Sequence, residues 1–305
     1  MTNPQNAPAA AALWMLAAML VIGFIDNYVT VIAREIGLWQ FFILRSAIAI
    51  PLVWIMSRLG MGAFWPRRWW PVLGRSFLLT LAMLCYFGAL GLMPIAQALA
   101  GLFTSPIFVL LIGWAVLGHR FGPWRAVAVL VGFAGVLLVL QPGGQGVSAW
   151  LVLPLAGGAF YAMSALATRS WCTGESTICL LAWMLAMQVA VSALVLGLIP
   201  LAGLQGDGFL TRAWVWPVQQ SWGLIWLQAV GSVAGVFGII RAYQLAEASH
   251  VSVFEYSVMI WGPLFGWVLF AQSVGSWQGA GIALIILAGL LIAWRGHRLQ
   301  TPDPI

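Results

Sequence analysis

Four charged residues lie inside long apolar stretches of this 305-residue chain: Asp26, Arg45, Arg241 and Glu255. A charge near the centre of a bilayer costs about 3 kcal/mol even on the lower, insertion-based scales, so such residues are usually buried, paired or functional. A carboxylate binds a proton or an amine, and a guanidinium binds a carboxylate. These four residues are therefore the first candidates for holding a polar substrate or a proton.

Asp26 and Arg45 are expected at similar depths in two consecutive spans. Asp26 lies eight residues before Arg34, near the end of its span, which is about 12 Å of helix at ~1.5 Å per residue. Arg45 lies seven residues after Leu38, where the next span begins at the same face. We expect the two side chains to pair or to share a polar substrate. A purely structural buried pair is the alternative.

The second half of the chain repeats this arrangement at the other face. Arg241 is near the end of one predicted span, and Glu255 lies seven residues after Ala248, where the next begins. Glu255 is the deeper acid of this half and is followed directly by Tyr256, so both are predicted to bind substrate, or protons in the case of Glu255. The alternative for Arg241 is that its long side chain only extends to the interface.

Aromatic residues within the apolar stretches form a second set of candidates. Tyr86, Tyr161 and Trp261 are selected because an aromatic face stacks on a flat or cationic substrate. The tryptophans near the ends of the stretches are typical of an interfacial belt instead.

The composition requires a lipid environment. The chain is 63% hydrophobic and 7% charged, whereas a soluble domain carries roughly 25% charged residues. The formal net charge is +6, and every basic residue other than histidine is an arginine. Most of them lie in short loops on alternate sides of the spans, which the positive-inside rule explains without a nucleic-acid partner.

The sequence carries no pattern typical of a metal or cofactor site. The cysteines are Cys85, Cys172 and Cys179, and the histidines are His119, His250 and His297. They lack metal-ligand spacing, and we expect no metal, no cofactor and no disulfide. The chain also lacks an ATP-binding loop and the sequence motifs of an intramembrane enzyme.

Ten stretches are long enough to span a bilayer, which takes roughly 20 mostly apolar residues. They are 10–33, 38–57, 72–92, 94–117, 123–141, 149–170, 177–201, 221–246, 248–271 and 276–295. The fold class expected is an all-α membrane protein. The first stretch has no basic segment before it and is interpreted as a retained span.

The arginines predict the orientation of these spans. Those of the even-numbered loops and the tail are Arg58, Arg67, Arg68, Arg75, Arg120, Arg125, Arg169, Arg295 and Arg298. The odd-numbered loops carry only Arg34 and Arg212. Both termini are therefore predicted in the cytoplasm of a bacterial cell, with the chain crossing the inner membrane several times.

A motif that occurs twice indicates two related halves. Gly-Trp, seven residues, Gly, one residue and Trp occurs at 113–124 and again at 266–277, 153 positions apart. With five spans per half, the second half begins at the opposite face, so the repeats are inverted, an arrangement typical of secondary transporters. The predicted units are 1–147 and 148–305.

These two regions resemble the paired modules of the EamA family in the drug/metabolite transporter superfamily. The first, 88–144, contains GALGLMPIAQALAGLFTSPIFVLLIGWAVLGHRFGPW, and the second, 241–296, contains RAYQLAEASHVSVFEYSVMIWGPLFGWVLFAQSVGSW. The resemblance covers nearly the whole chain and implies ten helices around a central substrate cavity. The chain departs from the family at His119 and Gln272, where an acidic residue is common.

The function predicted is secondary transport of a small polar or zwitterionic metabolite, such as an amino acid exported from the cell, by alternating access. Protons are a possible coupling ion, and the oligomeric state is left open. The run at 250–261 is similar to a branch with uptake carriers for vitamins and nucleoside derivatives, so uptake of a flat aromatic metabolite such as riboflavin or S-adenosylmethionine is the alternative. A non-transporting structural or channel-like membrane protein is the alternative of another class.

Overall fold

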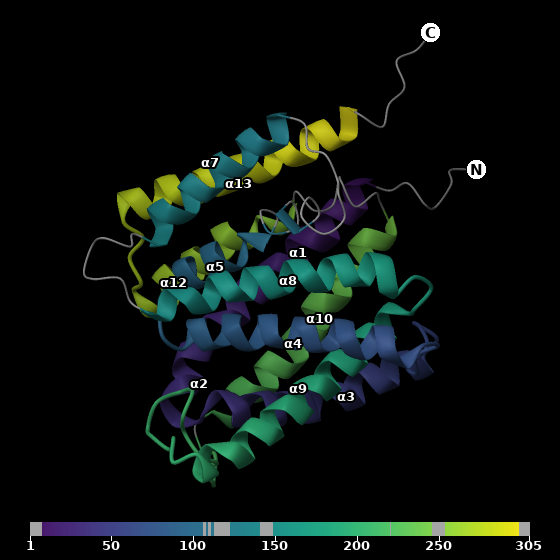
Figure 1. Ribbon diagram of the computed structural model, residues 1–305, viewed down its shortest axis with the longest axis vertical. Helices are drawn as coiled ribbons and strands as arrows, with labels where there is room; N and C mark the ends of the chain where they lie inside the picture. Colours follow the sequence, from purple (N-terminus) through teal and green to yellow (C-terminus); the bar gives the residue numbers. More distant parts are fainter. Residues whose placement is uncertain are drawn as a thin grey trace.

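The structure is a computed structural model that describes residues 8–105, 108, 111–112, 123–140, 149–219, 221–245 and 254–298. In these residues the regular elements are helices, without strands (Figure 1). The α-helices are α1 (Pro8–Asp26), α2 (Val29–Glu35), α3 (Leu38–Arg58), α4 (Trp69–Leu90), α5 (Ile95–Leu102), α7 (Pro123–Leu140), α8 (Val152–Trp171), α9 (Thr177–Leu201), α10 (Trp222–Leu245), α12 (Val258–Phe270) and α13 (Ser276–Arg298). A short 3-10 helix, η1 (Ala149–Leu151), precedes α8.

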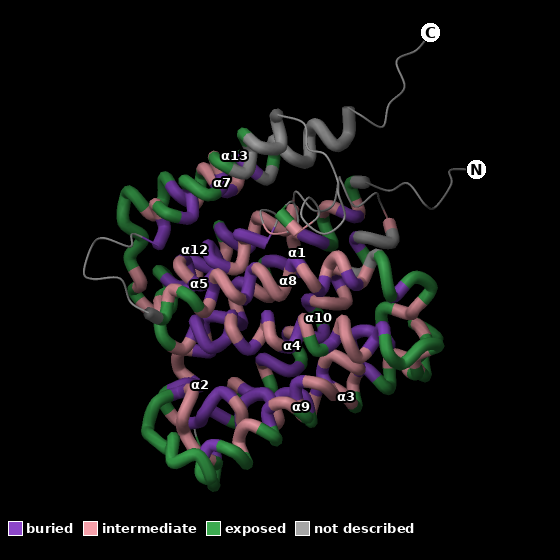
Figure 2. Tube along the Cα trace, in the orientation of Figure 1, coloured by how far each residue is buried: buried purple, intermediate pink, exposed green. Residues whose placement is uncertain are grey.

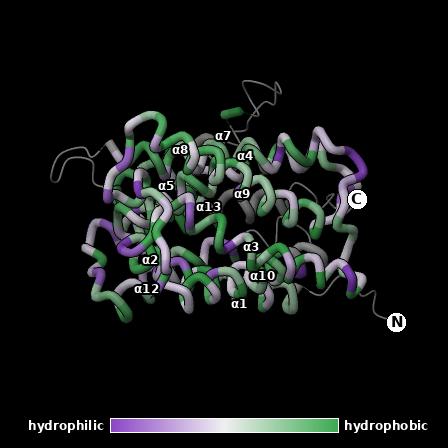
Figure 3. The backbone as a smooth tube through the Cα atoms, turned by 90° about the horizontal axis from the view of Figure 1, so that it is seen from below, coloured by the Kyte–Doolittle hydropathy of each residue, from purple (hydrophilic) through white to green (hydrophobic). Residues whose placement is uncertain are grey.

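Five helical segments of this part of the chain are long and apolar enough to cross a membrane. They are Ala9–Glu35, Leu38–Arg58, Trp69–Leu90, Thr177–Leu201 and Trp222–Ile239. Hydrophobic residues dominate the helices, and hydrophilic residues gather near their ends (Figure 3). The prediction of an all-helical membrane fold is confirmed. Parts of the predicted fourth and ninth spans, and the first copy of the Gly-Trp motif, fall outside the described residues.

The first predicted span is not one uninterrupted helix. α1 ends at Asp26, and α2 begins at Val29 after a turn. The Asn27 side chain causes the break, because its Nδ2 donates to the Gly23 carbonyl at 2.7 Å and to the Gly262 carbonyl at 3.0 Å. A side chain that takes such a carbonyl competes with the helix backbone. The break leaves the Asp26 carboxylate at a helix end inside the bundle.

The helices pair in a regular pattern. α1 packs against α10 and α12, and α8 packs against α4 and α5. α3 packs against α9 and α10, α9 also packs against α4, and α7 packs against α13. Figure 1 shows α7 and α13 side by side along one edge, with α3 and α9 at the opposite edge. The remaining helices fill the space between these two pairs.

Glycines allow two of these pairs to approach closely. A Cβ at Gly231 of α10 would lie 2.8 Å from Ile25 of α1, and a Cβ at Gly135 of α7 would lie 2.7 Å from the Gly281 carbonyl of α13. Small residues at such positions bring helix backbones together.

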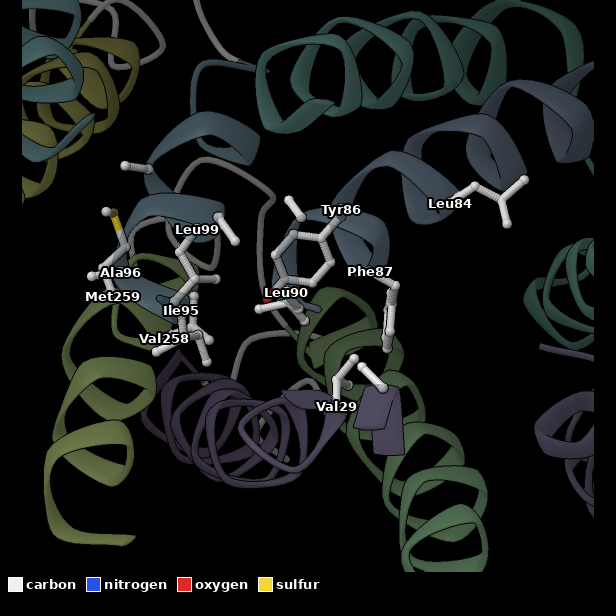
Figure 4. Close-up of a cluster of buried hydrophobic side chains, with 14 of the residues drawn as sticks. Val29, Leu84, Tyr86, Phe87, Leu90, Ile95, Ala96, Leu99, Val258 and Met259 are labelled. Atoms are coloured by element: carbon white, nitrogen blue, oxygen red, sulfur yellow. The ribbon is translucent and has the colours of Figure 1, made fainter. Parts of the chain in front are cut away.

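The main hydrophobic core lies where α1 to α5 meet α10 and α12. Figure 4 shows Ile95 and Leu99 of α5 close to Val258 of α12, with Tyr86 and Phe87 of α4 beside them. Buried residues follow the inner faces of the helices, whereas exposed residues cover the connecting loops (Figure 2). The polar residues described next lie within this core.

The two ends of the bundle differ in charge. The arginine-rich end, defined here by loops 59–68 and 172–176, carries Arg67 and Arg68. The opposite end, defined by loop 202–221 and the turn between α2 and α3, carries Arg212.

Candidate functional site

Asp26 and Tyr86 form the centre of a buried polar cluster. The Tyr86 hydroxyl donates to Asp26 Oδ2 at 2.9 Å. Asp26 is 3% exposed and Tyr86 is 4% exposed. A carboxylate in this setting needs hydrogen-bond donors, because burying it without them is costly. Tyr86 supplies this donor from α4, and Gln228 of α10 lies close enough to Asp26 to interact with it.

Arg45 joins this cluster from α3. Its NH2 donates to Oε1 of Gln188 on α9 at 2.9 Å. The guanidinium carbon also lies 4.7 Å from the ring centroid of Phe42 and 4.8 Å from that of Phe87. A cation over an aromatic face is stabilised by the ring quadrupole. Arg45 is therefore held by one amide and by rings of two helices, at 3% exposure.

Asp26 and Arg45 lie close enough to interact electrostatically, although each has its own hydrogen-bond partner. Their predicted pairing, or sharing of a substrate, stays a prediction. A paired charge offsets part of the cost of burial. The cluster thus joins residues from α1, α3, α4, α9 and α10 at the centre of the fold.

Two glutamines of this cluster were missed by sequence reasoning. Gln188 and Gln228 are fully buried, and Gln228 Nε2 donates to the Ile25 carbonyl at 2.6 Å. Among the buried atoms that have no hydrogen-bond partner within the described residues are three of this cluster: Arg45 Nε, Gln188 Nε2 and Gln228 Oε1. Leaving such atoms unpaired costs about 1–3 kcal/mol each. The sequence did offer one signal for these two glutamines, because an uncharged amide side chain is unusual in an apolar stretch.

A second group contains Tyr161 and Glu255. The two side chains interact electrostatically, and Tyr161 also interacts with Arg75. Arg75, which the sequence placed near the second loop and inside the span 72–92, lies in α4, where its Nε donates to Thr168 Oγ1 at 3.0 Å. Its NH1 donates to the Leu180 carbonyl at 3.2 Å.

Tyr256 and Trp261 lie where α12 meets α1 and α5. The Tyr256 ring is 5.3 Å from that of Phe103, next to the end of α5. Trp261 packs against Gly23 of α1, and its buried Nε1 has no hydrogen-bond partner within the described residues. Trp261 therefore lies close to the break between α1 and α2, whereas Tyr256 lies at the end of α5.

Arg241 lies apart from the cluster, at the arginine-rich end. It is exposed and lines a pocket of about 580 Å³ together with Glu175, Ser176 and Phe237. This position fits the interpretation that its side chain reaches the interface. The predicted pairing of Arg241 with Glu255 stays a prediction.

The membrane-crossing helices and the polar cluster buried among them define a multi-pass membrane protein with an intramembrane polar site. Residues 9–141 match the EamA-like transporter family. Over these residues the chain is similar to that family, and its apolar helices and bacterial transporter relatives indicate a multi-pass protein of a bacterial inner membrane.

Several named transporters are similar over most of the chain. A riboflavin transporter of Rhizobium johnstonii is 26% identical, and the alignment covers 95% of this chain and 92% of that protein. The pseudopaline exporter CntI of Pseudomonas aeruginosa is 28% identical, with coverage of 82% and 84%. An S-adenosylmethionine uptake transporter of Rickettsia bellii is 20% identical, with coverage of 74% and 73%.

One crystal structure supports the fold. It has a TM-score of 0.65 and 20% sequence identity, and the match covers 96% of this chain and 99% of that one. The arrangement of helices is therefore one that has been seen in an experimental structure.

Proposed function

We propose that this transporter carries a flat, hydrogen-bonding metabolite of the flavin type into the cell by alternating access. The buried cluster of Asp26, Arg45, Tyr86, Gln188 and Gln228 is proposed as its binding site. The observation that carries the proposal is the chemistry of the unpaired atoms: two nitrogen donors, on Arg45 and Gln188, and one amide oxygen acceptor, on Gln228.

This set of atoms favours a neutral heterocycle over a zwitterion. The edge of a flavin offers carbonyl acceptors and an N–H donor, which complement such a set. Asp26 Oδ2 and the NH2 of Arg45 already have partners within the protein. The rings of Phe42 and Phe87, which lie against the Arg45 guanidinium in this structure, are the flat surfaces proposed to stack on the ligand. Similarity to riboflavin transporters adds support.

A zwitterionic metabolite is the second candidate. Its support is the electrostatic contact of Asp26 with Arg45, which places opposite charges in one buried cluster. A 28% identical relative is named as an exporter of pseudopaline. Glu255, Tyr161, Tyr256, Trp261 and Arg241 remain proposed contributors to substrate binding, with Glu255 or Asp26 as the proton carrier if transport is coupled to protons.

Alternating access rests on a proposed architecture of ten spans in two inverted repeats, 1–147 and 148–305, with both termini in the cytoplasm. The helix pairs support it. Exchanging α1, α3, α4, α5 and α7 with α8, α9, α10, α12 and α13 turns the α1–α10 contact into α8–α4, and the α1–α12 contact into α8–α5. The same exchange turns α10–α3 into α4–α9 and leaves α3–α9 and α7–α13 unchanged. Inverted repeats of this kind rock against each other around a central site.

Counterflow in proteoliposomes tests the substrate. Vesicles loaded with unlabelled riboflavin should accumulate labelled riboflavin, whereas vesicles loaded with an amino acid should not. Gln188→Leu should reduce this flux at least about tenfold, the effect of losing one or two buried hydrogen bonds. Gln205→Leu, in the exposed loop 202–221, is the matched control and should leave the flux unchanged. Accumulation driven by amino acids but not by flavins would favour the zwitterion instead.

A further inference from the structure

Glu35 connects the first half of the chain to the beginning of α10. It is the last residue of α2, and both of its carboxylate oxygens accept backbone N–H groups. Oε1 accepts from Gln219 N at 2.7 Å, and Oε2 accepts from Ser221 N at 2.6 Å. Ser221 directly precedes α10. The carboxylate therefore holds the N-terminal end of this helix, where the helix dipole favours a negative charge.

Glu175 makes the same connection at the arginine-rich end. It lies in the loop after α8, and both of its oxygens also accept backbone N–H groups. Oε2 accepts from Arg67 N at 3.0 Å, and Oε1 accepts from Arg68 N at 2.9 Å. Arg68 directly precedes α4 and has no capping bond from its own side chain. Glu175 thus holds the N-terminal end of α4.

A tryptophan accompanies each glutamate. Trp39 in α3, the helix after Glu35, donates from Nε1 to the Leu210 carbonyl at 2.7 Å. Trp183 in α9, the helix after Glu175, donates from Nε1 to the Phe64 carbonyl at 3.3 Å. Each indole therefore binds the long loop whose last residues the neighbouring glutamate holds.

The exchange of repeats described above relates these two sets of contacts. In this exchange the end of α2 is equivalent to the end of α8, and the beginning of α10 is equivalent to the beginning of α4. The local sequences differ, with Glu35 directly after Arg34 and Glu175 six residues after Arg169. The same bonds are nevertheless made, each between one half of the chain and the other. A carboxylate that accepts two N–H groups makes charge-assisted bonds, which are the stronger kind.

We propose that Glu35 and Glu175 are paired latches, which hold the two halves together at opposite faces of the membrane. Release of the Glu35 latch opens the substrate path at the end with loop 202–221, and release of the Glu175 latch opens it at the arginine-rich end. Both latches are closed in this structure, and the polar cluster between them is shielded from solvent. The inference rests on alternating access, the mechanism proposed above.

Labelling of single cysteines tests the latches without any substrate. The background is a chain in which Cys85, Cys172 and Cys179 are replaced by serine. Leu90→Cys reports on the end with loop 202–221, and Val72→Cys reports on the arginine-rich end. Both positions lie in α4 and are fully buried. A membrane-impermeant maleimide is added to spheroplasts or to inverted vesicles, and the rate of labelling is measured.

Glu35→Gln should raise the labelling rate of Leu90→Cys by about threefold to tenfold, as expected for the loss of roughly one net hydrogen bond, and should leave Val72→Cys unchanged. Glu175→Gln should do the reverse. Equal effects on both reporters, or no effect of either variant, would overturn the proposal.

Milder variants cover the case in which a glutamine variant does not fold, as judged by its elution from a size-exclusion column. Glu35→Asp and Glu175→Asp keep the charge but shorten its reach, and the same two reporters must respond in the same selective way. Selective labelling with no riboflavin counterflow would support the latches and count against the flavin substrate. Counterflow without selective labelling would do the opposite.

Discussion

The two ends of the bundle use the same kind of latch but are not sealed equally. At the end with loop 202–221, Gln40 adds two hydrogen bonds to Val215, at 2.7 and 2.9 Å. Leu38 N donates to the Phe209 carbonyl at 2.8 Å, and the Phe209 ring fills the space beside Gly91. At the arginine-rich end, a pocket of about 580 Å³ lies beside Glu175. The comparison indicates that the arginine-rich end is closer to opening.

The largest effect on stability and transport is expected in the polar cluster, which lies between the two ends. Arg45→Leu leaves Asp26 buried without its opposite charge. The change also removes the bond from Arg45 to Gln188 Oε1. Losing a hydrogen bond to a charged group costs about 1.5–3 kcal/mol, and the Gln188 oxygen left unpaired adds to that cost. We expect a lower unfolding temperature in detergent and no measurable counterflow, whichever face the substrate is added to.

Arg58→Leu is the matched control for this change, since Arg58 lies in the same helix but is exposed. Its unfolding temperature and flux should stay close to those of the unmodified protein. Equal unfolding temperatures of the two variants would show that Arg45 does not stabilise the polar cluster.

A smaller effect is expected where the tighter end is filled by a side chain. A Cβ at Gly91 would collide with the Phe209 ring. Gly91→Val should displace that ring and cost about 1–3 kcal/mol, the usual range for overpacking. Gly197→Val is the control, because nothing lies within 4 Å of a Cβ at that position in α9. Chemical denaturation that ranks the two variants equally would show that Phe209 does not seal this end.

Sequence reasoning found the charged part of the candidate site for a physical reason. A charge in an apolar stretch is costly enough to be conspicuous, which is how Asp26 and Arg45 were selected. Gln188 and Gln228 were missed because an uncharged amide costs less and changes hydropathy little. Arg75 lies within the predicted span 72–92 but was used only to orient the chain, so its bonds to Thr168 and to the Leu180 carbonyl were missed.

The fold class followed from composition, but the break in the first span did not. An apolar stretch looks continuous in hydropathy whether or not its helix is interrupted. Asn27 interrupts it by bonding to Gly262, which is 235 positions away, and such a contact cannot be read from local sequence. The latches were missed for the same reason, because each glutamate binds backbone of the other half. The charged residues of the loops were used only to predict the orientation of the spans, so their contacts were not considered.

The smallest effect is expected when only one of the hydrogen bonds that close each end is removed. Trp39→Phe and Trp183→Phe each remove one indole hydrogen bond, worth about 0.5–1.5 kcal/mol. The Trp39 bond is the shorter, at 2.7 Å against 3.3 Å. Loop 202–221 nevertheless keeps its two bonds to Gln40 and its two to Glu35, whereas loop 59–68 keeps the bonds to Glu175 and one from Arg68 NH2 to the Trp171 carbonyl. Amide exchange should therefore rise more in loop 59–68 after Trp183→Phe than in loop 202–221 after Trp39→Phe. The reverse order would mean that loop 202–221 is held mainly by the Trp39 hydrogen bond and not by Gln40 and Phe209.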